Sequence, residues 1–477
     1  MANLFDADRE IVGGITQISG ATSSPTTATD DTISLTTFSF LLPGTTAGLI
    51  DGLGGNDTLV LSSVDMRDVD IANIEGTTIL DTGSNQLDAT ELDDLGAITF
   101  TDTTTGTDAN LRLDFSDSGA SPTVGFGGPT DIGDNLTVSI TQTGQTDAQD
   151  VTLDFSGAIR GTVDSFLAYT GGDANETVTG TFGDDNINVR RGTNVVDAGD
   201  GADLLTADNG LNTLTGGDGD DIFATDRRAS DPTAFPTSFF LSSASGLFDG
   251  GAGDDTFRIF RGLFDTTQPN NYVASTFLGG DGDDTLFIRS TQGEGSTLDA
   301  GADDDLIRLQ GTFTNGTVDG GSGTDLLELD AVDATGTDFS NIAATTVTSR
   351  SPNTIDADEL GDLGPLTFSD LTPTATSQDA WIRLNYAGLG TPVTVGTSGI
   401  STLGDGVYLY IDVTGQSASQ DVTLDFSGLA RAANSRFDYI GGDANETVTG
   451  TAGDDNINVG RGTNVVDAGD GADLLTA

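Results

Sequence analysis

Hydrophobic and polar residues follow two different patterns along the chain. In the first, apolar and polar residues alternate over short runs such as LRLDF (Leu111–Phe115), LTVSI (Leu136–Ile140) and VTLDF (Val151–Phe155). A period of two is typical of short, half-buried β-strands. In the second, one large apolar residue recurs at every ninth position between Gly- and Asp-rich turns. Neither pattern has the period of a helix, so an all-β fold is predicted.

The second pattern is regular enough to be written as a repeat. Six nonapeptides follow one another without a break from Gly171 to Ala224. Position four is Gly in five of them, position six is acidic or Asn in all, and position eight is always Val, Ile, Leu or Phe. This is the template G-G-x-G-x-D-x-U-x, in which U is a large apolar residue. Further matches start at Gly250, Gly279, Ala300 and Gly320, and a looser one starts at Gly52.

A longer repeat contains the shorter one. Residues 171–207 recur almost unchanged as residues 441–477, and DVTLDFSG occurs at both 150–157 and 421–428. The chain is therefore a tandem array whose unit spans the distance from Gly171 to Gly441, and its stop inside a repeat suggests a fragment of a longer protein. We expect five segments: a partial roll at 1–60, a β-rich domain at 61–170, a Gly/Asp roll at 171–330, a second β-rich domain at 331–440, and the start of a second roll at 441–477.

The acidic residues of the chain are nearly all aspartates. There are 75 acidic and 17 basic residues, for a formal net charge of -58, and only eight of the acids are Glu. Asp favours turns and is a hard oxygen ligand suited to Ca²⁺. A disordered acidic chain is the alternative, but 35% of the residues are hydrophobic and they stand at regular positions. The charge disfavours a nucleic-acid partner, and no apolar run is long enough for membrane insertion.

The Gly/Asp turns are candidate calcium sites. Gly at positions one, two and four allows a close approach of the backbone, so carbonyl groups can point at an ion, and the acid at position six adds a carboxylate. Stacked coils lie about 4.8 Å apart, so carboxylates of successive coils repel each other by roughly 1 kcal/mol per pair in water. Bound Ca²⁺ would reverse that sign, and we expect several ions. The predicted metal ligands are Asp57, Asp185, Asp203, Asp221, Asp255, Asp284, Asp305, Asp325, Asp455 and Asp473.

These nonapeptides resemble the hemolysin-type calcium-binding repeats of the repeats-in-toxin (RTX) family. The resemblance implies a right-handed parallel β-roll, in which each nonapeptide is a Gly-rich turn followed by a short strand and two nonapeptides make one coil. It also implies a secreted, extracellular protein that leaves a Gram-negative bacterium by type I secretion. The β-rich domains between the rolls are expected to be sandwich-like, with a continued solenoid as the alternative.

The two edges of such a roll carry different residues. Because two nonapeptides make one coil, alternate nonapeptides fall on the same edge. One edge carries Asp185, Asp203 and Asp221, and the other carries Glu176, Asn194 and Asn212. We infer a one-sided calcium ladder, with a second edge that is closed by amides or by variable loops. The alternative is that the Asn turns bind Ca²⁺ equally well through their carbonyl groups.

Composition also bears on function. The chain has no His, Lys or Cys, which excludes a Ser–His pair, a Schiff-base lysine and a thiol nucleophile, and we expect no enzyme. The tandem units favour a calcium-stabilised structural protein of the bacterial cell surface, either a surface layer (S-layer) or an extracellular filament, and the composition resembles RTX-type surface-layer proteins. Its expected partners are copies of itself, end to end or in a lattice, and Ca²⁺ could bridge it to surface polysaccharide. The alternatives are the extender region of a large RTX adhesin and, third, a fragment of an RTX toxin or exoenzyme.

Overall fold

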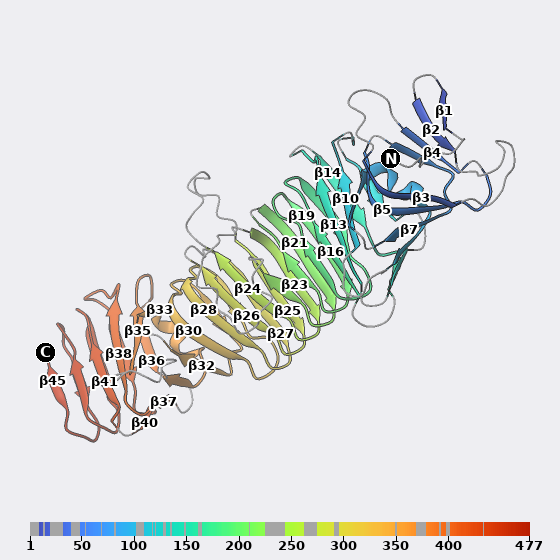
Figure 1. Cartoon of the computed structure of the whole chain (residues 1–477). Helices are drawn as coiled ribbons and strands as arrows, with labels where there is room; N and C mark the ends of the chain where they lie inside the picture. The colour runs from blue at the N-terminus through green and yellow to red at the C-terminus, as the bar shows by residue number, and fades with distance from the viewer. Residues whose placement is uncertain are drawn as a thin grey trace. The chain divides into compact units, whose positions relative to one another are not determined.

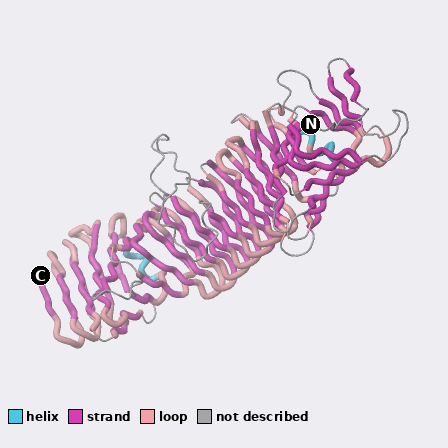
Figure 2. Tube along the Cα trace, in the orientation of Figure 1, coloured by secondary structure: helices cyan, strands magenta, loops and turns pink. Residues whose placement is uncertain are grey.

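The structure is a computed structural model, and its regular elements are almost all strands. Helix is limited, in the part of the chain that the structure describes, to three short 3₁₀ segments: η1 (Ala89–Glu91), η2 (Asp93–Leu95) and η3 (Ala357–Gly361) (Figure 2). The described residues are 9–477 apart from 13–14, 20–31, 40–47, 53, 68, 81–82, 102–108, 117, 120, 127–129, 134–135, 147–148, 161–164, 209, 225–243, 262–273, 291–294, 349–350, 369–377, 391–392, 397–400 and 433.

The chain divides into two compact units, residues 1–222 and 223–477, and each is described by itself. The strands of unit 1 are β1 (Arg9–Val12), β2 (Ile15–Ser19), β3 (Thr32–Ser39), β4 (Gly48–Asp51), β5 (Thr58–Met66), β6 (Val69–Ala72), β7 (Gly76–Leu80), β8 (Ser84–Asp88), β9 (Ala97–Thr101), β10 (Ala109–Asp114), β11 (Thr123–Gly125), β12 (Thr130–Ile132), β13 (Thr137–Thr143), β14 (Asp150–Asp154), β15 (Ala158–Arg160), β16 (Phe166–Thr170), β17 (Asn175–Thr179), β18 (Asp185–Asn188), β19 (Asn194–Asp200), β20 (Leu204–Thr206) and β21 (Gly210–Asp218), and β22 (Ile222–Ala224) begins at its last residue.

Parallel ladders build most of unit 1 (Figure 1). Strands β9, β12 and β15 form one ladder, β10, β13 and β16 a second, and β11, β14 and β17 a third. The chain passes through β10, β11 and β12 before Val138 of β13 pairs with Ala109 of β10, so each coil contains three strands. Only β1 and β2 pair in antiparallel fashion among the described strands.

The coil narrows from three strands to two where the nonapeptides begin. The first ladder has its last strand at β15, whereas β16, β18 and β20 continue the second ladder and β17, β19 and β21 continue the third. Register partners are now two nonapeptides apart, as in Leu167 with Asp185 and Thr177 with Val195. The coil of two nonapeptides that the sequence predicts is therefore present.

Unit 2 contains a roll first and three-strand coils after it. Its strands are β23 (Ala244–Ala252), β24 (Thr256–Arg261), β25 (Thr276–Asp281), β26 (Thr285–Ser290), β27 (Thr297–Ala302), β28 (Leu306–Thr312), β29 (Thr317–Asp319), β30 (Leu326–Asp333), β31 (Asp338–Ser340), β32 (Ala344–Val347), β33 (Asn353–Asp356), β34 (Leu366–Phe368), β35 (Gln378–Asn385), β36 (Val393–Gly396), β37 (Thr402–Leu403), β38 (Val407–Thr414), β39 (Asp421–Asp425), β40 (Ala430–Arg431), β41 (Arg436–Ile440), β42 (Asn445–Thr449), β43 (Asp455–Asn458), β44 (Val465–Asp467) and β45 (Leu474–Thr476).

Strand β30 is where the roll of unit 2 widens. The roll consists of the ladders β24–β26–β28–β30 and β23–β25–β27–β29–β31. The first half of β30 pairs with β32, and its last residue, Asp333, pairs with Thr354 of β33. One strand of the roll is therefore followed by two strands in the next coil. Three-strand coils follow until β40. Beyond β40 the coil again has two strands, and Phe437 of β41 pairs with Asp455 of β43.

The sandwich-like form expected for residues 61–170 and 331–440 is wrong, and the continued solenoid is correct. In a β-sandwich the neighbouring strands are mostly antiparallel, whereas every described pairing within these two segments is parallel. Alternation of apolar and polar residues says only that one face of a strand is buried, which is true of both folds. The all-β parallel roll itself is confirmed. Of the partial roll expected at 1–60, residues 1–8, 13–14, 20–31, 40–47 and 53 lie outside the described residues.

The core of each roll is a narrow stack of position-eight side chains. In unit 1, Ile187 is the register partner of Leu205, and Val196 is that of Leu214, and each of these side chains is buried. In unit 2, the rings of Phe223 and Phe257 stack with their centroids 4.6 Å apart. Burial of such side chains contributes about 1.5–3 kcal/mol each, and it fixes which face of every strand points inward.

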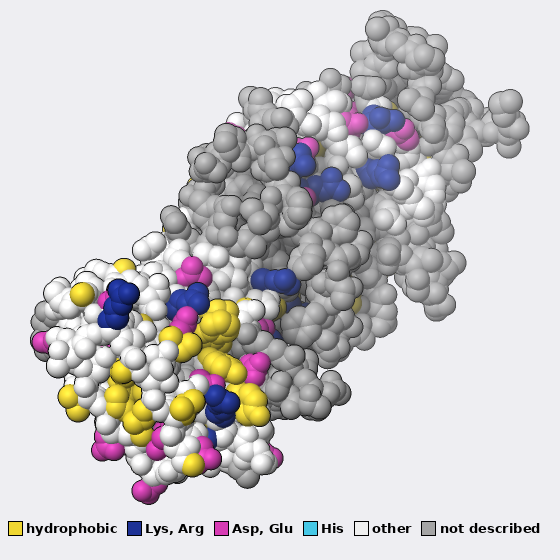
Figure 3. Space-filling view, turned by 90° about the vertical axis from the view of Figure 1, so that its left-hand side faces the viewer, with side chains coloured by type: hydrophobic (Ala, Val, Ile, Leu, Met, Phe, Trp, Pro, Cys, Tyr) yellow, Lys and Arg dark blue, Asp and Glu magenta, His cyan; other side chains and the backbone are white. Residues whose placement is uncertain are grey.

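The last coil of unit 2 exposes part of its apolar surface. Val465, Leu474 and Leu475 are each more than half exposed, and Figure 3 shows apolar side chains gathered among charged ones on this side of unit 2. Val465 and Leu474 stand at position seven, which faces outward, as the exposed Val195 does in unit 1. Leu475 stands at the inward position eight, where a side chain inside a stack is covered by the coils on both sides, and it lies in the last coil of unit 2. Among the described residues, none of the helices is long or apolar enough to cross a lipid bilayer.

Candidate metal centre

The position-six aspartates of unit 2 form a ladder along one edge of the roll. The backbone N–H of Asp255 donates to Oδ1 of Asp284 at 2.7 Å, that of Asp284 donates to Oδ1 of Asp305 at 2.8 Å, and that of Asp305 donates to Oδ1 of Asp325 at 3.1 Å. These four side chains are each only 1% exposed. Each turn therefore holds the carboxyl group of the next turn inside the protein, where an aspartate is rarely found without a partner.

Two rungs of this ladder use one carboxyl oxygen for a hydrogen bond and leave the other without one. Oδ2 of Asp284 and Oδ2 of Asp305 are buried and accept no hydrogen bond. A buried ionised carboxylate without a compensating partner costs several kcal/mol. The edge is therefore complete only when these acids are neutral or when a cation lies beside them.

Glycine at position one keeps open a space that oxygen atoms face. A Cβ atom on Gly279 would lie 1.9 Å from the carbonyl oxygen of Ala300 and 2.3 Å from Oδ2 of Asp284. A Cβ on Gly250 would lie 2.0 Å from Oδ2 of Asp255 and 2.3 Å from the carbonyl oxygen of Gly279. The same pair of oxygens, one carbonyl and one carboxylate, thus faces the glycine in successive turns.

The pKa values of these acids reflect their surroundings. Burial, opposed in part by a backbone hydrogen bond and aided by the like charges of Asp255 and Asp305, raises the pKa of Asp284 to about 8. Burial likewise raises the pKa of Asp305 to about 7, with Asp325 as a like-charged neighbour. In a metal-free roll it is therefore costly to keep this row of carboxylates ionised near neutral pH.

These donors fit Ca²⁺, which takes six to eight oxygen ligands from carboxylates and backbone carbonyls. No group of three acidic side chains among the described residues is arranged to hold a metal by itself, so carbonyl oxygens have to contribute. Residues such as Gly279, Asp284 and Ala300 would hold the ion between successive turns. Bound Ca²⁺ would supply the positive charge that the buried carboxylates lack.

The Asp turns of unit 1 repeat this geometry. The N–H of Asp185 donates to Oδ1 of Asp203 at 2.6 Å, and the N–H of Asp203 donates to Oδ1 of Asp221 at 2.7 Å. Asp57 is different, because its N–H donates to Oε2 of Glu75 at 2.7 Å, so its next rung is a glutamate. The sequence pattern missed Glu75, since no nonapeptide surrounds it.

The opposite edge of the unit 1 roll is an amide ladder. Asn194 Oδ1 accepts from the N–H of Glu176 at 2.9 Å, and Asn194 Nδ2 donates to Oδ1 of Asn212 at 2.9 Å and to the carbonyl of Val189 at 3.4 Å. A neutral amide with partners on both sides needs no cation. Glu176, which heads this ladder, has a buried oxygen without a hydrogen-bond partner, and burial raises its pKa to about 8. The two edges therefore differ in chemistry, and calcium on one edge alone stays a prediction.

Hydroxyl groups replace the amides on the opposite edge in unit 2. Ser275 Oγ accepts from the N–H of Gly246 at 3.1 Å, and Ser296 Oγ accepts from the N–H of Ser275 at 3.2 Å. Both serines are buried. The sequence pattern indicated only variable loops here, because these serines lie in stretches of unequal length that fit no nonapeptide.

A second row of aspartates, at position five, lines the exposed rim of the edge that carries the buried Asp ladder. The N–H of Asp283 donates to Oδ1 of Asp254, and the N–H of Asp304 donates to Oδ1 of Asp283, both at 2.9 Å. These bonds run in the opposite direction to the buried ladder. The Asp-Asp pairs in the sequence are the signal that could have identified this row.

Nine of the ten predicted ligands are buried to 3% exposure or less, and Asp473 is partly exposed. Asp455 differs from the acids of the unit 2 ladder. Thr451 donates to both of its oxygens, at 2.6 Å from the backbone N–H and 2.6 Å from Oγ1, and Arg431 donates to Oδ1 at 2.9 Å. Its N–H donates to Oδ1 of Asp473 at 2.9 Å, which makes these two residues one rung of a further ladder.

Removal of one rung from each edge tests the difference between them. Asp203→Ala leaves the N–H of Asp185 without its acceptor, and Asn212→Ala does the same to Nδ2 of Asn194, so each loses about 1 kcal/mol of hydrogen bonding. Only Asp203→Ala also removes a carboxylate from the Asp edge. We expect calorimetry to show fewer bound Ca²⁺ ions for Asp203→Ala and an unchanged number for Asn212→Ala. Equal losses in the two variants would refute a one-sided ladder.

Comparison with known families agrees with the geometry. A family model described as the RTX calcium-binding nonapeptide repeat (4 copies) matches residues 170–205, 197–227 and 440–475. No curated protein and no solved structure was found to match the chain. The matched residues contain the Asp ladders at Asp185–Asp221 and at Asp455–Asp473.

Proposed function

This chain carries RTX calcium-binding nonapeptide repeats, and on that premise we propose that it is a structural protein of the bacterial cell surface whose rolls fold around Ca²⁺. Proteins with such repeats are typically secreted. Outside the cell, Ca²⁺ is present at the concentrations of about 10⁻⁴–10⁻³ M that extracellular modules use. The surface layer or extracellular filament is the assembly that we propose, and no catalytic activity is part of the proposal.

The orphaned carboxyl oxygens carry this proposal. Oδ2 of Asp284 and of Asp305 are buried beside glycine turns and accept no hydrogen bond, although Oδ1 of each acid is held by the N–H of the preceding rung. An enzyme would need a small number of acids in special surroundings, whereas here the same rung is repeated along the stack. Repetition suits a mechanical or scaffolding role better than a single reaction site.

The tandem unit supports association with further copies. Both kinds of coil occur twice within the chain, so roll and three-strand coils already follow one another in a single polypeptide. A net charge of -58 would keep separate molecules apart at low ionic strength, and divalent cations reduce that repulsion. An adhesin extender shares the tandem unit, and it is the second candidate because it needs no contact between molecules.

Assembly in the presence of calcium separates these two candidates. For a surface layer or filament, millimolar Ca²⁺ should raise the mass measured by light scattering several-fold, and electron microscopy should show ordered sheets or fibres. Mg²⁺ at the same ionic strength is the control, because it screens charge but prefers a smaller octahedral site. A monomer at every calcium concentration would refute self-assembly by this chain and would favour the extender.

A further inference from the structure

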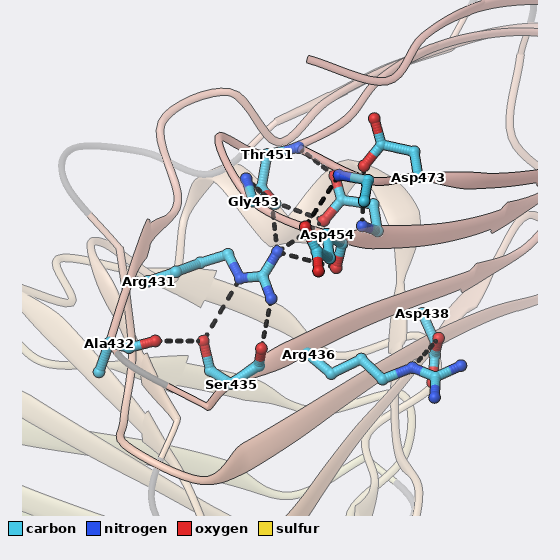
Figure 4. A network of polar contacts seen from close by, with 11 residues as sticks. Arg431, Ala432, Ser435, Arg436, Asp438, Thr451, Gly453, Asp454 and Asp473 are labelled. Atoms are coloured by element: carbon cyan, nitrogen blue, oxygen red, sulfur yellow. Dashed lines mark hydrogen bonds and ion pairs between the residues drawn. The ribbon is translucent and has the colours of Figure 1, made fainter. Parts of the chain in front are cut away.

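A buried arginine occupies the first Asp turn of the second roll (Figure 4). Nη1 of Arg431 donates to Oδ1 of Asp455 at 2.9 Å, to Oγ1 of Thr451 at 3.1 Å and to the carbonyl oxygen of Asp454 at 3.0 Å. On the other side of the guanidinium, Nε donates to Oγ of Ser435 at 3.3 Å and Nη2 donates to the carbonyl oxygen of Ser435. The Arg431 side chain is 11% exposed and that of Asp455 is fully buried.

Three of the oxygens that surround this guanidinium belong to the nonapeptide turn that contains Asp455. They comprise one carboxylate, one hydroxyl and one backbone carbonyl, and two further oxygens belong to Ser435. Neither oxygen of Asp455 is without a hydrogen bond, in contrast to Asp284 and Asp305. The charge of the predicted ligand Asp455 is therefore already matched by that of Arg431.

Arg431 also lies where the architecture changes. It is the last residue of β40, which ends the ladder β32–β34–β37–β40, and the turn that it contacts opens the two-strand roll at β43. The guanidinium thus bonds the end of the three-strand coils to the first rung of the roll. At the corresponding place in the other copy, DFSGLAR becomes DFSGAIR, and Arg160 ends β15 where the third strand is lost.

Glycine makes room for this contact. A Cβ atom on Gly453 would lie 2.6 Å from Nη1 of Arg431 and 2.9 Å from its Cζ, so the guanidinium is packed directly against the backbone of the turn. By contrast, Arg436 in the same segment is half exposed, and its Nε donates to Oδ1 of Asp438 at 2.8 Å. Two arginines in one short segment therefore have very different surroundings.

We propose that Arg431 is a built-in cation, which takes the place of Ca²⁺ at the first Asp turn of the second roll and joins that roll to the three-strand coils in the absence of the ion. The proposal rests on the proposed function, because a substitute for calcium requires that the later Asp turns bind it. The coil that contains Asp455 is then already in the correct register without Ca²⁺, and the calcium-dependent coils stack on it.

Arg431→Gln in the full chain is the test, with Arg436→Gln as the matched control. Loss of one partner of a buried ion pair should speed hydrogen exchange at residues 450–458 by about a hundredfold in calcium-free buffer. With millimolar Ca²⁺, Arg431→Gln should recover protection and bind at least one more ion per chain than the wild type in equilibrium dialysis. Arg436→Gln should match the wild type in both measurements, and Arg431→Lys should keep part of the protection and gain no ion.

Each contrary result has its own meaning. Equal exchange at 450–458 in Arg431→Gln and Arg436→Gln would overturn the proposal, and so would a loss of protection that is accompanied by no additional Ca²⁺. If Arg431→Gln unfolds the segment under all conditions, Arg431→Lys provides the test instead. Lysine keeps the positive charge, so an additional bound Ca²⁺ ion in Arg431→Lys would contradict the proposal that this charge replaces the ion. A failure of the proposed function would be seen in a different measurement. In the wild-type protein, hydrogen exchange around Asp284 and Asp305 would then be the same with and without Ca²⁺.

Discussion

Without calcium, the rolls should lose their protection from hydrogen exchange while the three-strand coils keep theirs. In the roll of unit 2, removal of the ion leaves ionised Asp284 and Asp305 buried beside like charges. Two corners of the three-strand coils are held by neutral amides instead. Nε2 of Gln149 donates to the carbonyl of Phe115 at 3.0 Å, and Nε2 of Gln420 donates to that of Tyr386 at 3.3 Å. Neutral corners gain nothing from a cation, so the two kinds of coil should respond differently.

Hydrogen exchange read by mass spectrometry measures both kinds of coil in one sample. Peptides from 276–330 should exchange at least about a hundredfold faster in calcium-free buffer than in millimolar Ca²⁺, if each buried charge costs several kcal/mol. Peptides from 109–154 are the internal control and should change little. The transition should be centred at about 10⁻⁴–10⁻³ M Ca²⁺. Protection of 276–330 that is the same with and without the ion would contradict the assignment of the Asp edge.

Low pH should partly replace calcium in stabilising the roll of unit 2. The folded-state pKa of Asp284 is raised to about 8 and that of Asp305 to about 7, whereas an unfolded aspartate titrates near 3.9. Between these values the folded roll binds more protons than the unfolded chain, so the stability of the calcium-free roll falls as pH rises. The stability that these two acids contribute to the calcium-free roll is complete below about pH 4 and is lost as pH rises through about 7–8.

Circular dichroism in calcium-depleted buffer should therefore show more β-structure at about pH 5 than at about pH 8. In saturating Ca²⁺ the dependence should reverse, because protons compete with the ion for the same carboxylates. Asp284→Asn is the control. Its amide keeps Oδ1 as an acceptor for the N–H of Asp255 but cannot ionise, so the calcium-free variant should be more stable at about pH 8 and less sensitive to pH. A calcium-free roll that gains stability as pH rises would contradict the burial of these acids.

The nonapeptide rolls could be predicted in detail because their rules are local. Gly at position one, Asp at position six and a large apolar residue at position eight recur within each nonapeptide, and every second nonapeptide returns the chain to the same edge. Ile187 and Leu205 are paired and buried as that spacing requires, and Asp185 and Asp203 form successive rungs. A short, constant period reveals both the strand and its register.

The three-strand coils and their contacts could not be read in the same way. These longer coils have corners of different length and composition, such as Gln149 and Ser165, so no fixed spacing marks them. The contact of Arg431 with Asp455 joins two kinds of coil. The sequence pattern reveals the period within the nonapeptide roll. It gives no signal for a hydrogen bond between the roll and the three-strand coils beside it.

Coil length in the roll of unit 2 varies on one side only. Successive rungs from Asp255 to Asp325 are separated by 29, 21 and 20 residues, yet the N–H to Oδ1 distances stay at 2.7, 2.8 and 3.1 Å. The additional residues lie between the end of one strand, as at Arg261 of β24, and the start of the next, as at Thr276 of β25. The Asp edge therefore keeps nearly the same spacing between rungs, while the far side accommodates coils of 20 to 29 residues. For protein design, we expect the far side to accept inserted loops or tags while the rung spacing of the Asp edge stays the same.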